Sequence, residues 1–108
     1  MNYYHFWVDL IDSHKAKEFC SAVHEYLGHL KENGFVEGHG LTRRKLGFGP
    51  GKLGEFHISI HVKDLVQFES TFKAVANPDE KTARLHANVY SRVKNMKTGL
   101  YRDYPDVF

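Results

Sequence analysis

The chain has 108 residues and a formal net charge of +2, with 42% hydrophobic and 26% charged residues. This balance is that of an ordinary globular domain, and it excludes a disordered, collagen-like or coiled-coil chain. So small a net charge points to no class of partner, whereas eight phenylalanines, six tyrosines and eight histidines are an unusual content for a chain of this length.

Length and cysteine content set the expected context. A chain of this size can bury about two-thirds of its unfolded surface, so we expect one domain over residues 1–108. No apolar run approaches the ~18 residues of a membrane helix, and we expect neither a membrane segment nor a signal peptide. The single cysteine forms no internal disulfide and excludes zinc motifs built on cysteine pairs. We therefore expect a cytoplasmic protein.

The first predicted elements are a strand and a long helix. Tyr3–Leu10 places its apolar residues on one phase, which predicts a strand. A helix follows, capped by Ser13 and running to about Glu32, because its apolar residues recur with the helical period. Asn33-Gly34 ends it.

Two further strands follow, joined by a glycine-rich turn. Phe35–Phe48 contains a strand whose register is blurred by glycines and by the basic run Arg43-Arg44-Lys45. After the turn at Gly47–Gly54, Glu55–Val62 alternates cleanly between apolar and polar residues and predicts the clearest strand of the chain.

The C-terminal part begins with a second long helix. Asp64 caps it, and its apolar stripe consists of Leu65, Phe68, Phe72 and Val75. Residues 84–93 fit either a helix or a strand. The capping signals favour a helix over 79–96, because Pro78 suits a first helical position and Lys94 and Lys97 suit the last turns. Leu100–Tyr104 is then a short final strand, which Pro105 stops.

The predicted order is that of the split βαβ pattern, an α+β, ferredoxin-like antiparallel sheet with its helices on one face. The other face stays uncovered. On the first and third strands, which are central neighbours in this order, it carries Tyr3, His5, Trp7, Asp9, Glu55, His57, Ser59 and His61. Aromatic rings and histidines on an uncovered sheet face indicate an interface or a ligand groove.

With this element order and segments such as Phe6-Trp7-Val8 and Phe56–His61, the chain resembles the dimeric α+β barrel superfamily. In that superfamily two ferredoxin-like subunits place their sheets face to face and enclose a pocket. The resemblance implies a homodimer joined through the sheet faces. Members include cofactor-poor monooxygenases, isomerases, lyases and stress-responsive proteins, so the resemblance does not fix the function.

We predict that a pocket between the two sheets binds an apolar or aromatic compound with a polar or acidic head. Arg102, flanked by Tyr101 and Tyr104, is expected to provide the cationic end of this pocket. The predicted ligand-binding residues are Tyr3, His5, Trp7, His57, Ser59, His61 and Arg102.

Two other interpretations stay open. The protein could be a cofactor-poor enzyme of the monooxygenase, isomerase or lyase type, with a sheet-face histidine as general base. His57 is the best candidate because it lies at mid-strand. Alternatively, the same residues only pack a dimer interface.

Two sequence patterns resemble a nucleotide-binding motif and a metal-binding motif, but neither meets the requirements of such a site. Gly49–Gly54 has the letters of a dinucleotide fingerprint, but it opens a strand instead of a helix, and Leu53 stands where a P-loop needs Ser or Thr. His57 and His61 lie roughly 13 Å apart along a strand, too far to bind one ion by themselves. We therefore expect no metal and no cofactor.

Nucleic-acid binding and a reactive thiol are also not favoured. The basic run at 43–45 is too short to indicate nucleic acid, and the uncovered phase of the third strand lacks the aromatic residues on which bases stack. Cys20 and His24 are spaced as helix neighbours. Because Cys20 lies in the apolar stripe of its helix, we expect a buried structural thiol and not a reactive pair.

Overall fold

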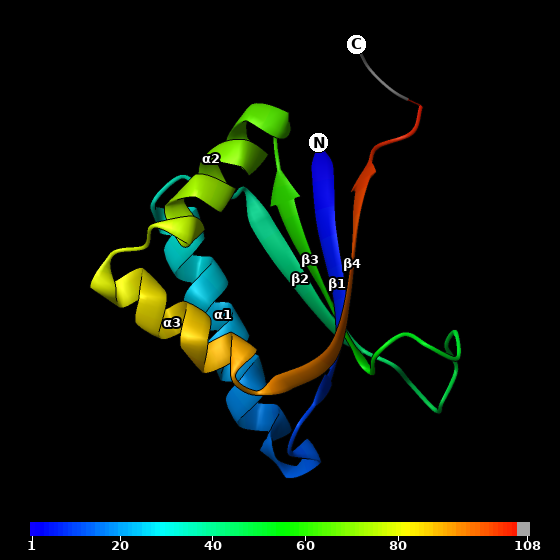
Figure 1. Ribbon diagram of the computed structural model, residues 1–108. Helices are drawn as coiled ribbons and strands as arrows, with labels where there is room; N and C mark the ends of the chain where they lie inside the picture. The colour runs from blue at the N-terminus through cyan, green and yellow to red at the C-terminus, as the bar shows by residue number, and fades with distance from the viewer. Residues whose placement is uncertain (106–108) are drawn as a thin grey trace.

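Four strands and three α-helices form two layers in the computed structural model, which describes residues 1–105 (Figure 1). The elements are β1 (Asn2–Leu10), a 3-10 turn at Ser13–Lys15, α1 (Ala16–Glu32), β2 (Gly38–Arg43), β3 (Phe56–Val62), α2 (Leu65–Ala76), α3 (Glu80–Tyr90) and β4 (Val93–Arg102). The strand order is β2-β3-β1-β4, and every neighbouring pair is antiparallel. This is the predicted ferredoxin-like α+β fold. No helix within residues 1–105 is long and apolar enough to span a membrane.

All three helices lie on one side of the sheet, and the opposite side is bare (Figure 1). The core sits between α1 and the sheet, where Phe6, Val8 and Ile58 from the strands pack with Phe19 and Leu27 from α1. All five are at most 2% exposed. Even-numbered residues of β1 and β3 thus fill the core, and odd-numbered residues form the uncovered surface, which we call the open face.

The helix predicted over 79–96 is too long. It ends at Tyr90, and Val93–Arg102 pairs with β1 as the edge strand β4. Asp79 is the N-cap and accepts a hydrogen bond from the backbone N–H of Thr82, so Pro78 lies outside the helix and not in its first turn. The extension was wrong because the residues after Tyr90 gain more from the open edge of β1, whose backbone groups need partners, than from continued helix.

Smaller corrections concern other boundaries. The second strand is Gly38–Arg43, shorter than the segment that contained it, and the third begins at Phe56. Asp12, and not Ser13, caps the first helical turn, since its carboxylate accepts a hydrogen bond from the backbone N–H of His14.

Helix α2 is poorly buried, although Asp64 caps it as predicted and accepts a hydrogen bond from the Gln67 backbone N–H at 2.8 Å. None of its residues is buried, and Leu65 and Phe72 of its apolar stripe are 60% and 51% exposed. The helix therefore packs onto the core through only part of its apolar stripe, where Phe68 is partly buried and its ring contacts Tyr4 of β1.

Candidate functional site

The open face brings the predicted sheet residues together. In the β1–β3 ladder Tyr3 faces His61, His5 faces Ser59, and Trp7 faces His57. The His57 ring lies nearly parallel to Trp7, with centroids 5.0 Å apart, and the ring of Tyr101 meets His5 edge-on at 4.9 Å. The rings thus pack against one another along the middle of the sheet. His5, Trp7 and His57 are half-buried even in one subunit, whereas Tyr101 is 58% exposed.

A hydrogen bond links two imidazoles at the centre of this face. His5 Nδ1 lies 2.7 Å from His57 Nε2, and the ring planes differ by 7°. His57 Nδ1 in turn lies 3.4 Å from the hydroxyl of Thr42. Burial lowers the pKa of both histidines, and the neighbouring imidazoles lower that of His5 further. One ring must accept the hydrogen bond, so the pair cannot hold two full positive charges without breaking it.

Glycines on the outer strands leave room beside these rings. Gly40 faces Ser59, and Gly99 faces His5 from the other side. A Cβ at Gly99 would lie 3.0 Å from the ring of Tyr101, so a side chain at position 99 would force that ring to shift from its place beside His5. Ser59 and His61 form a second polar pair, with Ser59 Oγ 2.7 Å from His61 Nε2.

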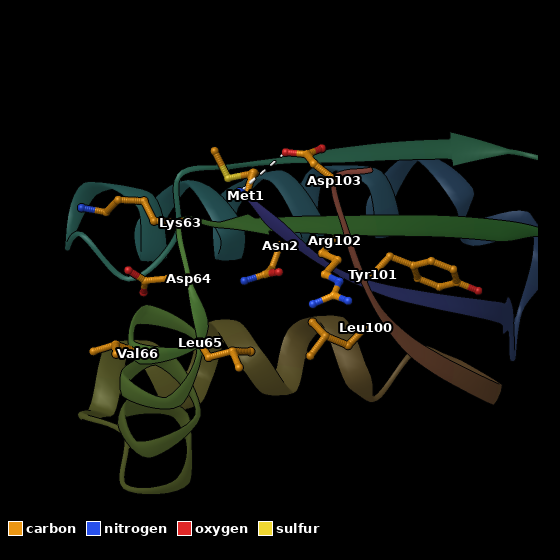
Figure 2. A pocket seen from close by; sticks show the side chains of 10 residues that line it. All are labelled: Met1, Asn2, Lys63, Asp64, Leu65, Val66, Leu100, Tyr101, Arg102 and Asp103. Atoms are coloured by element: carbon orange, nitrogen blue, oxygen red, sulfur yellow. Dashed lines mark ion pairs between the residues drawn. The ribbon is translucent and has the colours of Figure 1, made fainter. Parts of the chain in front are cut away.

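Arg102 does not join the open face. It pairs with Asn2 in the β1–β4 ladder and therefore shares the opposite phase. It lines a pocket of about 720 Å³ between the end of the sheet and the start of α2. Figure 2 shows its side chain near Leu65 and Leu100. The open face instead carries Lys97, which faces Trp7, and Lys94, which faces Asp9, although both lysines were expected at the end of a helix. Tyr104, the other predicted neighbour of Arg102, is 91% exposed.

Cys20 is half-buried, so the expectation of a fully buried thiol was wrong. Its helix neighbour His24 instead contacts His39 on β2, with the two ring nitrogens 2.7 Å apart. Within residues 1–105 no three histidine, cysteine or acidic side chains are grouped to hold a metal ion.

Sequence reasoning missed an apolar cavity of about 340 Å³ on the helix side, between α2, α3, α1 and the sheet. We call it the α2 cavity. Phe68 and Phe72 of α2 meet edge-on at 4.7 Å, and Tyr4 of β1 contacts both rings. Its aromatic lining consists of Tyr4, Tyr26, Phe68, Phe72, His86 and Tyr90.

Tyrosine hydroxyls, the imidazole of His86 and the hydroxyl of Thr71 are the polar groups in the cavity lining, and Tyr26 and Tyr90 are the two tyrosines whose pKa burial raises. Tyr26 is 4% exposed, and Tyr90 is half-buried. Within residues 1–105 neither hydroxyl makes a hydrogen bond, and neither is sealed from solvent. Burial raises the pKa of Tyr26 to about 12, raises that of Tyr90 and lowers that of His86. All three side chains are therefore uncharged near neutral pH.

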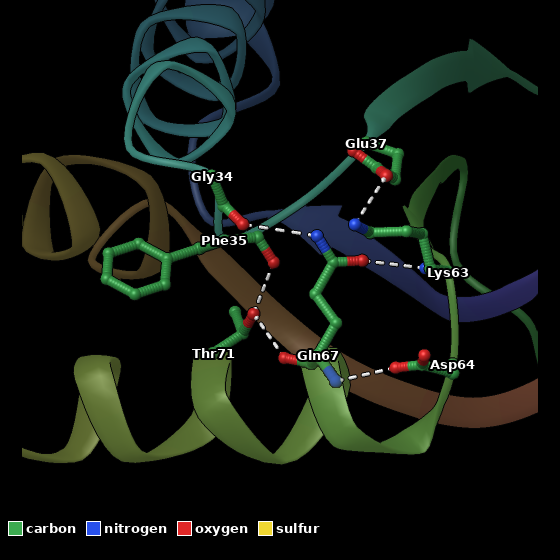
Figure 3. A network of polar contacts seen from close by, with 7 residues as sticks. All are labelled: Gly34, Phe35, Glu37, Lys63, Asp64, Gln67 and Thr71. Carbon is green, nitrogen blue, oxygen red and sulfur yellow. Dashed lines mark hydrogen bonds and ion pairs between the residues drawn. The ribbon is translucent and has the colours of Figure 1, made fainter.

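Polar contacts attach α2 to the segments beside it (Figure 3). The amide of Gln67 donates to the carbonyl oxygen of Gly34 at 3.1 Å and accepts from the backbone N–H of Lys63 at 2.7 Å. The hydroxyl of Thr71 shares its hydrogen between the carbonyl oxygens of Phe35 and Gln67. These contacts join the first turns of α2 to the loop before β2 and to the end of β3, while the rest of the helix overhangs the cavity.

Comparisons place the chain among proteins of the same fold. A model of a family of unknown function, DUF6614, matches residues 1–108. No curated protein matches. The chain is similar to the solved structure of SnoaB, a cofactor-independent oxygenase from Streptomyces nogalater, with 10% identity, a TM-score of 0.71 and coverage of 98% of this chain and 95% of that chain.

Two other solved structures show the same likeness. One is a dimeric ferredoxin-like protein of unknown function from Jannaschia sp. CCS1, with 8% identity, a TM-score of 0.68 and coverage of 94% of this chain and 98% of that chain. The other is an antibiotic biosynthesis monooxygenase, with 13% identity, a TM-score of 0.61 and coverage of 97% and 100%. Identities this low show the fold alone, and at that level they confirm the resemblance to dimeric α+β barrel proteins.

Proposed function

Because the chain belongs to DUF6614, a family of unknown function, and shares its fold with dimeric ferredoxin-like proteins, we propose that it is a homodimer that binds a small apolar or aromatic molecule. The α2 cavity is the binding site, and the open face is the surface through which two copies meet.

One observation supports the binding site: the α2 cavity combines an apolar lining with three tyrosine hydroxyls, those of Tyr4, Tyr26 and Tyr90, that have no hydrogen-bond partner within residues 1–105. Ligand sites are commonly apolar hollows of about 300–1,000 Å³ with a few polar groups that set the orientation. Burial of ligand surface supplies affinity at about 25 cal/mol per Å², before the costs of association. A hydroxyl that is not bonded to another protein group is available to donate or accept a hydrogen bond when a ligand replaces the solvent.

The open face fits an interface better than a pocket, because its rings already fill the space above the central strands. A monomer would expose this aromatic surface to water. The six sheet-face residues predicted to bind a ligand therefore meet the second copy in this proposal: Tyr3, His5, Trp7, His57, Ser59 and His61. An acidic head group would not meet Arg102 there, since that side chain lies on the other phase.

A second candidate function, a cofactor-poor enzyme, is favoured by the His5–His57 pair. Within residues 1–105 His5 Nε2 makes no hydrogen bond. In the tautomer in which His5 Nδ1–H donates to His57, the free Nε2 lone pair can accept a proton from a substrate held between two sheets. His57 then stabilises the resulting imidazolium, so the base is His5, with His57 behind it. SnoaB, which is described as a cofactor-independent oxygenase, has the same fold.

Binding is tested with 2-naphthol as the probe, by isothermal titration calorimetry. Val75→Trp fills the α2 cavity and should weaken binding at least about tenfold. The control Val66→Trp lies on the same helix, outside the cavity lining, and should leave the dissociation constant unchanged. Binding that survives Val75→Trp but is lost in Trp7→Ala would place the ligand between the sheets instead.

The dimer is tested by light scattering at micromolar concentration, where the mass should be twice the 12.5 kDa of the chain. Trp7→Arg should yield a folded monomer, because it buries an unpaired charge at the interface. A monodisperse monomer of the natural sequence would contradict the proposal. If the protein converts a bound compound, and His5→Ala abolishes this conversion without changing the affinity for that compound, the enzyme function would be favoured over binding alone.

A further inference from the structure

We infer that the ligand of the α2 cavity is an uncharged, flat aromatic molecule with a hydroxyl or carbonyl group, and not a carboxylate. This inference rests on the proposed function and narrows its ligand class. It departs from the acidic head expected from the sequence.

The arrangement of rings selects a flat molecule. His86 and Tyr90 lie nearly parallel, with centroids 4.3 Å apart and planes 29° apart. Tyr26 presents its ring edge-on to both, at 5.6 Å from His86 and 6.3 Å from Tyr90. Phe68 and Phe72 close the other side from α2. Aromatic rings favour offset parallel or edge-to-face neighbours, and such walls suit another ring better than a flexible chain.

The polar groups of the cavity select a neutral ligand. The hydroxyls of Tyr26 and Tyr90 stay protonated, because burial disfavours their anions. They can each donate a hydrogen bond to a carbonyl oxygen or accept one from a hydroxyl. His86 is uncharged for the same reason and adds one donor and one acceptor.

Charge is absent from the described lining. No Lys, Arg, Asp or Glu side chain within residues 1–105 lines the α2 cavity. A carboxylate would lose its water shell there without gaining an ion pair, which is costly in an apolar site. A hydroxyl or carbonyl loses less on leaving water and regains a hydrogen bond from a tyrosine.

The experiment compares three probes of one shape by calorimetry at about pH 7.5: 2-naphthol, 2-naphthoate and naphthalene. The protein should bind 2-naphthol at least about tenfold more tightly than 2-naphthoate, and several-fold more tightly than naphthalene. Tyr26→Phe and Tyr90→Phe should reduce the advantage of 2-naphthol over naphthalene and leave naphthalene affinity unchanged. Tyr101→Phe, on the open face, is the matched control and should change neither affinity.

The outcomes separate this inference from the proposed function. Equal or tighter binding of 2-naphthoate, weakened by Val75→Trp, would overturn the ligand class and leave the cavity as the binding site. An advantage of 2-naphthol that persists in both Phe variants would also overturn the role of the hydroxyls. Failure of all three probes to bind would overturn both proposals.

Discussion

Gly54 marks the closest approach between the loop before β3 and the backbone of β1. A Cβ at this position would lie 2.3–2.6 Å from the backbone N, C and O atoms of Val8. Backbone cannot move aside as a flexible side chain can, so any residue with a Cβ at position 54 would clash with β1.

Gly54→Ala should therefore lower the free energy of unfolding by about 1–3 kcal/mol, the usual cost of forcing extra volume into a packed site. Gly51→Ala is the matched control, since a Cβ there meets nothing within 4 Å. Urea denaturation followed by circular dichroism measures both. Equal stability of the two variants would show that β1 and this loop separate easily.

Single residues also show where prediction from sequence ends. The facing of Trp7 and His57 follows from strand period and strand order, both of which the sequence carries. Arg102 was assigned to the wrong face because its side depends on the register of β4 against β1, which no local pattern records. The hydroxyls of Tyr26 and Tyr90 look like ordinary core positions in the sequence, and only the position of α2 reveals them as unpartnered.

At the scale of elements, β1 and β3 could be predicted because buried and half-buried residues alternate along them. Strand β4 could not, because it is exposed along nearly its whole length and has no such alternation. The apolar stripe of α2 predicted packing onto the sheet. The position of α2 depends on hydrogen bonds of Gln67 and Thr71, whose partners Gly34 and Phe35 are more than thirty residues away.

Helix α2 should unfold locally more easily than α1, because it buries no residue while α1 buries six. Asp64→Ala removes the cap and costs about 1 kcal/mol, which should speed hydrogen exchange of the α2 amides about fivefold and leave α1 unchanged. Asp12→Ala, which removes the cap of the 3-10 turn, should not affect α2. Saturating 2-naphthol should slow α2 exchange in both variants. Uniform exchange across α1 and α2 would contradict this.

At the scale of the whole molecule, the proposed dimer should weaken in acid. Burial lowers the pKa of His5 and His57 below the ordinary 6.5 in one subunit already, and a second sheet would bury them further. The neutral forms are thus favoured in the dimer, so dissociation takes up protons. The dimer should keep its full affinity above about pH 6.5, and lose affinity as the pH falls through the lowered values.

Other charged and titratable groups share that face and set the background. They include Tyr3, Asp9, Glu55, His61, Lys94, Lys97, Tyr101 and Asp103. Sedimentation velocity over a pH series from 7.5 to 4.5 should show a dissociation constant that is constant above about pH 6.5 and rises as the pH falls below it. The double variant His5→Gln/His57→Gln should lose most of that rise. The matched variant His39→Gln, on the helix side of the sheet, should show the same rise in the dissociation constant as the natural sequence. If His39→Gln instead loses the rise and the double variant keeps it, the pH effect would come from folding and not from the interface.

Strand β1 is a wall shared by two compartments. Tyr4 points toward α2 and its cavity, while Tyr3 and His5 on either side of it point to the open face. Since adjacent strand residues face opposite ways, a substitution at any one position alters one compartment and spares the other. Descendants of this sequence can therefore diverge in what they bind without losing their mode of assembly, or change assembly while keeping the ligand, through replacements one residue apart.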